Sequence, residues 1–166
     1  PFDKGGTDGL ARALAIDGNA RLRNTPTIFN VGFNYAFNWD GAAKSLEDHA
    51  QALLTNTSVM AAQWPELLAR LRADGEYPGL FAAAYADGTT QANVLDALAT
   101  FERSLATPNA AFDRYLRGDR GALTADERRG YQLFKSYGCV ACHQGMNVGG
   151  NLFQKFGVFQ SADPAG

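Results

Sequence analysis

The apolar residues in the middle of the chain recur at helical spacing. Val94, Leu98, Phe101 and Leu105 follow one another at steps of four, three and four positions, which places them on one face of a helix over residues 90–105. Weaker patterns of the same kind predict shorter helices over residues 45–54, 65–72, 78–85 and 110–116. No stretch of useful length alternates apolar and polar residues with period two, so the predicted fold class is mostly α.

Polar residues and glycines mark where the later segments begin and end. Thr124 followed by Glu127 forms a capping box, in which each side chain accepts from the other residue's backbone N–H, and it predicts a helix that starts there. Gly138 is well placed to end that helix, because glycine adopts the left-handed conformation without strain. A polar, glycine-rich break at residues 118–121 predicts a domain boundary, which divides the chain into residues 1–118 and 119–166.

The first forty residues are rich in glycine and asparagine and show little periodicity. We predict a loop over residues 1–41, with one short helix near residues 9–15, and Pro26 ends any local helix because the residue before a proline avoids the helical region. A loop of this length is unusual in a compact domain unless it wraps around something or carries function.

Composition and charge exclude several classes of protein. The 166 residues include 15 Lys and Arg against 17 Asp and Glu, and a net charge of −2 argues against a dedicated nucleic-acid binder. With 46% hydrophobic and 19% charged residues, the chain is globular rather than disordered. Its longest apolar run, residues 80–86, is far too short to span a membrane, so no transmembrane segment is predicted.

The sequence has two cysteines and two histidines, and three of these four residues lie within one pentapeptide. Cys139, Cys142 and His143 form a CxxCH motif, which is the attachment signature of c-type haem. Two thiols three positions apart on a tight turn can each add to one vinyl group of haem, and the adjacent histidine becomes the proximal ligand of the iron. Covalent haem attachment implies the periplasm or another extracytoplasmic compartment.

Other uses of this motif carry less weight. A redox-active dithiol would not need His143 next to it, and a disulfide between the two cysteines would stand alone. A zinc site lacks a fourth ligand, because His49 is the only other candidate. Met146 follows His143 by three residues and therefore falls on the same side of the haem, so we predict that Met146, like Met60, has a packing role.

Four groups of short motifs occur in a specific order along the chain. They are Arg23-Asn24-Thr25-Pro26-Thr27 with Asn30; Trp39-Asp40-Gly41; Phe112-Asp113-Arg114-Tyr115 with Gly118-Asp119 and Leu123-Thr124; and Gly130, Leu133-Phe134, the CxxCH motif and Gly145. Their order and spacing resemble those of the bacterial di-haem cytochrome c peroxidase family and its di-haem oxidase relatives. The resemblance runs from about residue 18 to residue 157.

The resemblance implies an architecture of two cytochrome c-like helical domains with a haem c in each. In the family one haem receives electrons from a small carrier protein of the cytochrome c or cupredoxin type, and the other reduces hydrogen peroxide to water. By position, Cys139, Cys142 and His143 match the electron-receiving haem. Trp39 matches a tryptophan that assists electron transfer between the haems, and Asn24 matches a residue that helps to bind calcium at the domain interface. Family members are often homodimers.

The chain also departs from the family pattern. The first CxxCH motif is absent, and the distal methionine of the electron-receiving haem would lie beyond residue 166; both absences are expected of an incomplete chain. No histidine ligand occurs near residues 16–17, where many peroxidases have one, and Val59 stands at the position of the catalytic glutamate.

His49 stands where the family usually has a glutamine that faces the peroxidatic pocket. We hypothesise that His49 supplies the acid–base function missing at Val59, or ligates the distal face of that haem, since the pKa of histidine lies near neutrality. The alternative is a solvent-facing helix histidine beside Glu47 and Asp48.

The sequence therefore predicts a periplasmic haem c oxidoreductase of the di-haem peroxidase type. Two alternatives remain open: a di-haem oxidase that acts on a partner protein, and a non-enzymatic cytochrome c electron-transfer module.

Overall fold

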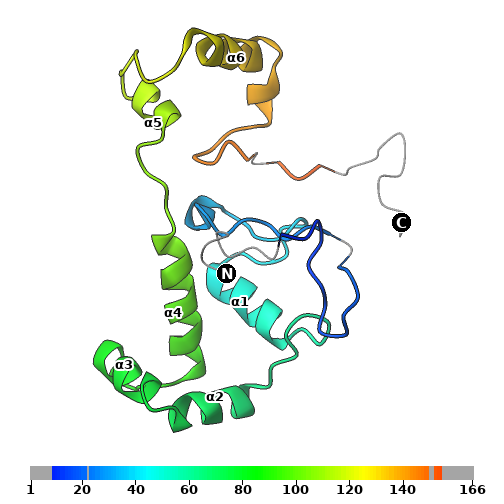
Figure 1. Cartoon of the computed structure of the whole chain (residues 1–166), viewed down its shortest axis with the longest axis vertical. Coiled ribbons are helices and arrows are strands. Elements are labelled where there is room, and N and C mark those ends of the chain that lie inside the picture. Colours follow the sequence, from blue (N-terminus) through cyan, green and yellow to red (C-terminus); the bar gives the residue numbers. More distant parts are fainter. Residues whose placement is uncertain (1–8, 22, 150–151, 155–166) are drawn as a thin grey trace. The chain divides into compact units, whose positions relative to one another are not determined.

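The computed structural model describes residues 9–21, 23–149 and 152–154 and is helical (Figure 1). The helices are η2 (Val31–Phe33), α1 (Leu46–Thr55), α2 (Trp64–Ala73), α3 (Tyr77–Ala84), α4 (Gln91–Ser104), α5 (Ala111–Leu116), α6 (Ala125–Ser136) and η3 (Cys139–Ala141). Extended pairing in the described part is limited to two isolated bridges, Leu14 with Ala20 and Phe37 with Ala43. The prediction of a mostly α fold is confirmed. Within these residues no helix is both long and apolar enough to cross a bilayer.

Contacts between residues divide the chain into two compact units. The first comprises residues 1–32 and 36–106, and the second comprises residues 33–35 and 107–166. Residues 107–118 therefore group with the CxxCH motif, and so does the short segment 33–35. The domain boundary at residues 118–119 and the cytochrome c-like two-domain architecture stay predictions.

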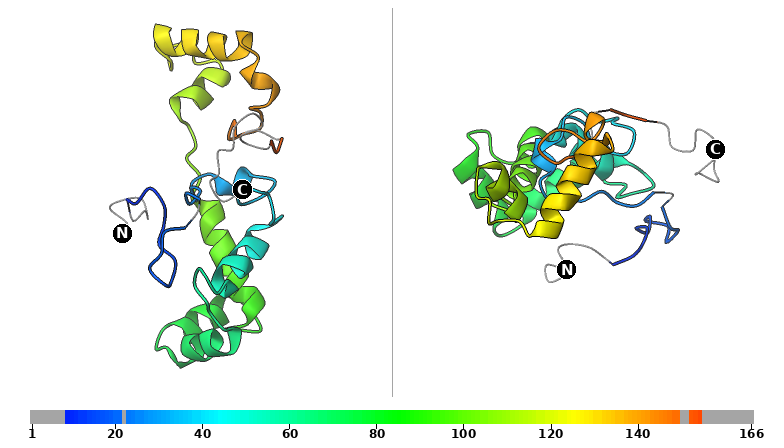
Figure 2. Two further views of the ribbon diagram at one scale, coloured as in Figure 1. Left: turned by 90° about the vertical axis from the view of Figure 1, so that its right-hand side faces the viewer. Right: turned by 90° about the horizontal axis from the view of Figure 1, so that it is seen from above.

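The first unit is centred on the packing of α1 against α4, which lie side by side in the views of Figures 1 and 2. Leu46 of α1 is 3% exposed and Ala99 of α4 is 1% exposed. Three residues of the segment before α1 complete the core: Val31 of η2 and the loop residues Phe37 and Ala43. The small side chain of Ala99 leaves room at the contact for the larger Leu46. The long N-terminal loop is thus fixed to the helices by its own apolar residues.

The helix ends follow the polar signals in the sequence. Thr124 Oγ1 accepts from the N–H of Glu127 at 3.2 Å, and Glu127 Oε2 accepts from the N–H of Thr124 at 2.7 Å, so the predicted capping box is confirmed. These hydrogen bonds lower the pKa of Glu127 below its ordinary value. Gly138 has φ 77° and ends the last turn after α6, also as predicted. The predicted helices between residues 45 and 116 all form, with ends that move by a residue.

The short helix predicted near residues 9–15 is wrong. That segment instead forms a narrow turn, in which Ala15 N–H donates to Asn19 O at 2.7 Å and Arg21 N–H donates to Ala13 O at 2.8 Å. Asp17 Oδ2 accepts from the side-chain Nδ2 of Asn19 and Asp17 Oδ1 accepts from the backbone N–H of Asn19, both at 3.0 Å, and these contacts lower the Asp17 pKa. Such local hydrogen bonds from an Asp side chain compete with helix formation. Of the loop predicted over residues 1–41, residues 1–8 lie outside the described part.

Candidate haem attachment site

The two cysteines of the motif lie on one tight turn directly after α6. Ala141 N–H donates to Gly138 O at 2.9 Å, and His143 N–H donates to Cys139 O at 2.9 Å, so the five motif residues wind into a single compact turn. Cys139 is half-buried and Cys142 is exposed, and both are free thiols. The left-handed Gly138 makes the sharp change of direction from α6 possible. Both cysteines and His143 thus lie on one backbone turn, and their role in haem attachment stays a prediction.

The His143 ring has a defined tautomer because one of its nitrogens is hydrogen-bonded to the backbone. Its Nδ1 lies 3.1 Å from Val148 O, which can only accept, so Nδ1 carries the proton. Nε2 then carries the lone pair, which is the arrangement that a metal-ligating imidazole requires. The Phe134 ring lies against the His143 ring, with centroids 6.2 Å apart. This tautomer fits the predicted role of His143 as an iron ligand.

A cavity of about 460 Å³ adjoins the motif within the second unit. Its lining includes His143 and is mainly apolar, with Phe112, Leu116, Tyr131, Phe134, Val140 and Val148. The rings of Phe112 on α5 and Tyr131 on α6 meet edge to face, with centroids 5.0 Å apart, and this contact holds the two helices together at the cavity wall. The volume lies in the range of cofactor sites. An apolar wall, two free thiols and an oriented imidazole fit a covalently bound haem.

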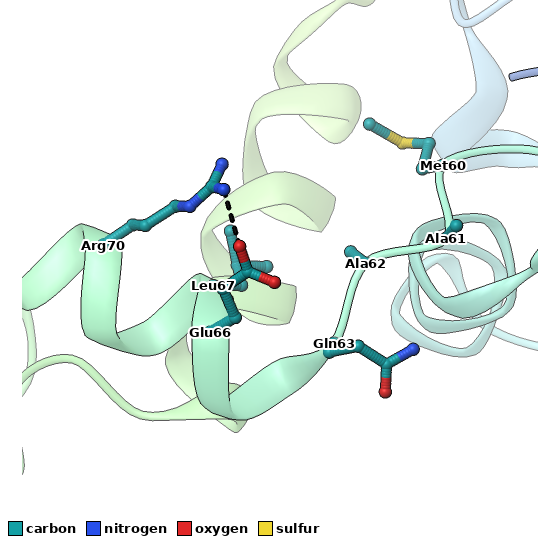
Figure 3. A pocket seen from close by; sticks show the side chains of 7 residues that line it. All are labelled: Met60, Ala61, Ala62, Gln63, Glu66, Leu67 and Arg70. Carbon is teal, nitrogen blue, oxygen red and sulfur yellow. Dashed lines mark hydrogen bonds and ion pairs between the residues drawn. The ribbon is translucent and has the colours of Figure 1, made fainter.

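Neither methionine packs as predicted. Met146 is 72% exposed and does not line the cavity, although Gly145 and Val148 on either side of it do. Met60 is 57% exposed and borders a second, smaller pocket of about 220 Å³ at the start of α2 (Figure 3).

Glu66 and Arg70 form an ion pair of 2.6 Å at this pocket, and both side chains are largely exposed, so the pair adds little stability.

The structure brings Trp39 and Asn24 together in the first unit. Trp39 Nε1–H donates to the backbone oxygen of Asn24 at 2.8 Å, while the indole remains 57% exposed. Asn24 Nδ2 donates to Ala11 O at 2.8 Å, which orients its Oδ1 away from that contact. Among the described residues, no three His, Cys, Asp or Glu side chains gather as a metal site.

His49 lies on α1 and is half-buried. The alternative to a functional role was a histidine that faces solvent, and the structure does not show that. Its Nε2 lies 3.0 Å from Asn38 Oδ1, and its ring packs on Phe37 with centroids 5.9 Å apart. Because an amide oxygen only accepts, Nε2 carries the proton and Nδ1 the lone pair. Nδ1 is buried and has no hydrogen-bond partner within the described residues. Burial lowers the pKa of His49, so the ring is neutral at pH 7.

The lowered pKa of His49 makes the stability of the chain depend on pH. The unfolded chain binds a proton at His49 at a higher pH than the folded chain does, so this residue's contribution is complete above about pH 6.5 and declines as the pH falls through that value. We expect the Tm of the wild type to fall more steeply than that of His49→Gln between about pH 7.5 and about pH 5.5, where histidine titrates. Circular dichroism melts at several pH values measure this, and parallel curves would contradict it.

Val59 lies in the turn that leaves α1. Its N–H donates to Asn56 O at 2.9 Å, and the same oxygen accepts from Ala61, which has φ 50°. Val59 is therefore an apolar, half-buried side chain in a tight turn, and it has no group that could move a proton.

Several residues of these sites were missed by sequence reasoning. Asn38 and Val148, which set the tautomers of the two histidines, gave no signal because an asparagine in a loop and a backbone carbonyl have no distinctive pattern. The aromatic residues Phe112 and Tyr131 are visible in the sequence, but their meeting at a cavity depends on how α5 and α6 pack.

Comparison with known proteins identifies the family to which the chain is similar. A family model described as di-haem cytochrome c peroxidase matches residues 1–121. The chain is 41% identical over 158 residues to cytochrome c peroxidase Ccp of Escherichia coli strain K12, covering 95% of this chain and 34% of that protein. It is 38% identical to cytochrome c551 peroxidase of Nitrosomonas europaea, covering 94% of this chain and 47% of the relative.

Two further matches are to proteins named MauG or MauG-like. The chain is 36% identical to the methylamine utilization protein MauG of Methylorubrum extorquens, covering 93% of this chain and 44% of that protein. The crystal structure of a MauG-like protein associated with microbial copper homeostasis superimposes with a TM-score of 0.72 at 30% identity, covering 82% of this chain and 42% of that one. The chain thus spans less than half the length of each of these relatives.

Proposed function

Because this chain belongs to the di-haem cytochrome c peroxidase family, we propose that it forms part of a haem c oxidoreductase that reduces hydrogen peroxide to water with electrons from a small carrier protein. The observation that carries the proposal is the turn of residues 139–143, where two free thiols and an oriented imidazole adjoin an apolar cavity. Cytochrome c and cupredoxin carriers both suit such a site, since each delivers one electron at a time.

Three residues would hold the haem in this segment. Cys139 and Cys142 would form its two thioether bonds, and His143 would ligate the iron through Nε2. When bound there, the haem supplies a one-electron redox centre. Phe134 and Val140 line the cavity and would exclude water from the macrocycle, which raises the strength of electrostatic contacts at the iron. A second haem c, attached outside this segment, belongs to the same proposal.

His49 is proposed as the proton-handling residue at the peroxidatic site. Its neutral ring has the proton on Nε2, shared with Asn38, and the lone pair on a buried Nδ1. A nitrogen of this kind can accept a proton from peroxide and return it to the departing oxygen, which is the work of a general base followed by a general acid. Because Val59 is apolar and cannot transfer a proton, another residue has to transfer the protons of peroxide. Ligation of the distal iron face by His49 is the competing role.

Trp39 and Asn24 complete the proposed site residues. The exposed indole of Trp39 is held by one hydrogen bond to Asn24 O, so its ring face stays open for electron transfer between two redox centres. Asn24 Oδ1 is proposed as one oxygen ligand of a calcium ion, which prefers oxygen donors such as amide carbonyls. The contact between the two residues would tie the orientation of the indole to the occupancy of that ion.

A second candidate function is a di-haem oxidase that acts on a partner protein. The observation that favours it is Val59, because a chain without the family's glutamate lacks the usual group for cleaving peroxide.

A periplasmic location and a homodimer are part of the leading proposal. The first is supported by the haem attachment motif, which matures outside the cytoplasm, and the second by family resemblance.

The number of haems and the reaction with peroxide test this proposal together. The intact protein, purified from cells that mature c-type haem, should contain two covalently bound haems per chain and should oxidise a reduced carrier when hydrogen peroxide is added. Mass spectrometry and the absorbance of the haem in alkaline pyridine give the count. One haem without peroxide reactivity identifies an electron-transfer module instead. Two haems that react with peroxide but transfer no electrons from carriers identify the oxidase.

A further inference from the structure

The turn after the haem attachment motif contains a strained residue. Val148 has φ 52°, in the left-handed region that residues with a branched β-carbon rarely adopt. The carbonyl of this same residue accepts the hydrogen bond from Nδ1 of His143 at 3.1 Å. The carbonyl that sets the tautomer of His143 therefore belongs to a residue, Val148, whose backbone conformation is energetically unfavourable. Strain of this kind persists only where surrounding contacts hold the residue in place.

Among the described residues, two hydrogen bonds act on the turn around Val148. Val148 N–H donates to Gly145 O at 3.1 Å, which closes the turn from within. From outside, Asn147 Nδ2 donates to Asn34 Oδ1 at 2.7 Å, across 113 positions of sequence. The residue next to the strained valine is thereby anchored to a distant segment of the chain.

The segment that provides this anchor belongs to the second unit by its contacts. Residues 33–35 group with residues 107–166 and not with their neighbours in sequence. Besides the contact of Asn34, the ring of Tyr35 meets the ring of Phe153 edge to face, with centroids 6.0 Å apart. The segment therefore contacts the chain after the CxxCH motif at two places, on either side of Gly149.

We propose that Asn34 is a positioning residue for His143. Through Asn147 it holds Val148 in the left-handed conformation, and so it keeps the Val148 carbonyl on Nδ1 of the imidazole. This inference rests on the proposed attachment of haem at Cys139, Cys142 and His143. Nothing in the CxxCH motif itself would fix the ring in this way, since the acceptor lies five residues beyond the histidine.

The expected consequence is a lowered reduction potential of the haem at this motif. A hydrogen bond from Nδ1–H to a carbonyl makes Nε2 a more basic ligand, and a more basic ligand favours the oxidised iron. If the anchor is lost, Val148 can relax to a negative φ and its carbonyl turns away from the ring. The ligand then becomes less basic, and the potential moves to a more positive value.

Redox titration of the intact, haem-loaded protein tests the anchor. The variants are Asn34→Ala, Asn147→Ala and the double variant. Ser136→Ala is a matched surface control in the same unit, since that exposed hydroxyl donates to Leu133 O on its own helix. We expect each single substitution to shift the potential positively by up to a tenfold change in the reduction equilibrium, about 59 mV for a one-electron couple. The double variant should shift no further than the larger single shift, because both changes break one contact.

A rescue experiment separates positioning from a general loss of structure. Glycine adopts positive φ without strain, so in a Val148→Gly background the turn no longer needs the anchor. We expect Asn34→Ala to shift the potential much less in that background than in the wild type. An undiminished shift would overturn the role assigned to the strained valine.

The other possible results of the redox titration also test the positioning role of Asn34. If both asparagine variants retain their haem and their wild-type potential, or if their shifts add in the double variant, the positioning role is overturned while the proposed function stands. If the wild-type protein carries no haem on Cys139 and Cys142, the proposed function itself fails. Should Asn34→Ala lose haem or unfold, Asn147→Ala decides alone, since Asn147 lies on an exposed turn.

Discussion

Replacing His143 with alanine is expected to reduce carrier-dependent peroxide turnover by about 100-fold or more, since even groups that only support a metal ligand are worth 10–100-fold. The two thioether bonds at Cys139 and Cys142 do not need the imidazole, so the haem should stay attached to the chain. Loss of Nε2 removes the axial ligand, which is a main determinant of the redox potential of haem. Steady-state turnover with a reduced carrier, together with the haem absorbance of the purified variant, measures both effects.

The control for this prediction is Gln132→Ala, an exposed position on α6 outside the cavity lining. It should retain wild-type turnover and haem content. Full turnover in a His143→Ala protein that still carries its haem would show that electrons do not enter at this motif, and the proposed function would have to be abandoned in that respect.

Replacing Leu46 with alanine is expected to destabilise the chain by about 2–5 kcal/mol, as is usual for large-to-small changes in a core. Leu46 is 3% exposed and belongs to one buried cluster with the loop residue Phe37 and Ala99 of α4. The described residues include few other large side chains buried to this degree, so neighbouring groups have little scope to fill the cavity. A loss of this size is a large fraction of the total stability of a domain. Thermal melts followed by circular dichroism measure it.

The matched control is Leu98→Ala, one position before Ala99 on the same helix. Leu98 is 40% exposed, so its truncation removes less buried apolar surface and should change the free energy of unfolding by well under half as much. Equal effects at the two positions would mean that the packing of α1 against α4 is not the centre of this unit.

The candidate site could be predicted in part from the sequence because its chemistry is local. The thiols of Cys139 and Cys142 and the imidazole of His143 lie within five residues, so their spacing alone brings them onto one turn. The capping box at Thr124 and the left-handed Gly138 are equally local, since each depends on backbone groups within three residues. Local hydrogen bonds and sterics of this kind leave a readable pattern.

The wrong predictions from the sequence concern a segment where helix and turn formation compete, and side chains whose role depends on whether they are buried. Asp17 and Gly18 turned the predicted helix near residues 9–15 into a hydrogen-bonded turn. The residue type of Met146 predicts a packing role, but its side chain is 72% exposed in the structure. His49 gave no signal of its half-buried position, which depends on Phe37 and Asn38 returning over α1.

By itself the sequence determined the helices, their ends and the haem attachment motif, because these depend on side chains within a few residues of one another. Only the tertiary structure decided that Asn34 meets Asn147 across 113 positions, that Val148 O accepts from His143, and that Asn38 leaves the lone pair of His49 on a buried Nδ1. Hydrogen bonds to backbone carbonyls and amide groups depend on where the chain returns in space. Asparagine and valine can serve in many loops, so no spacing in the sequence marks the few that orient a histidine.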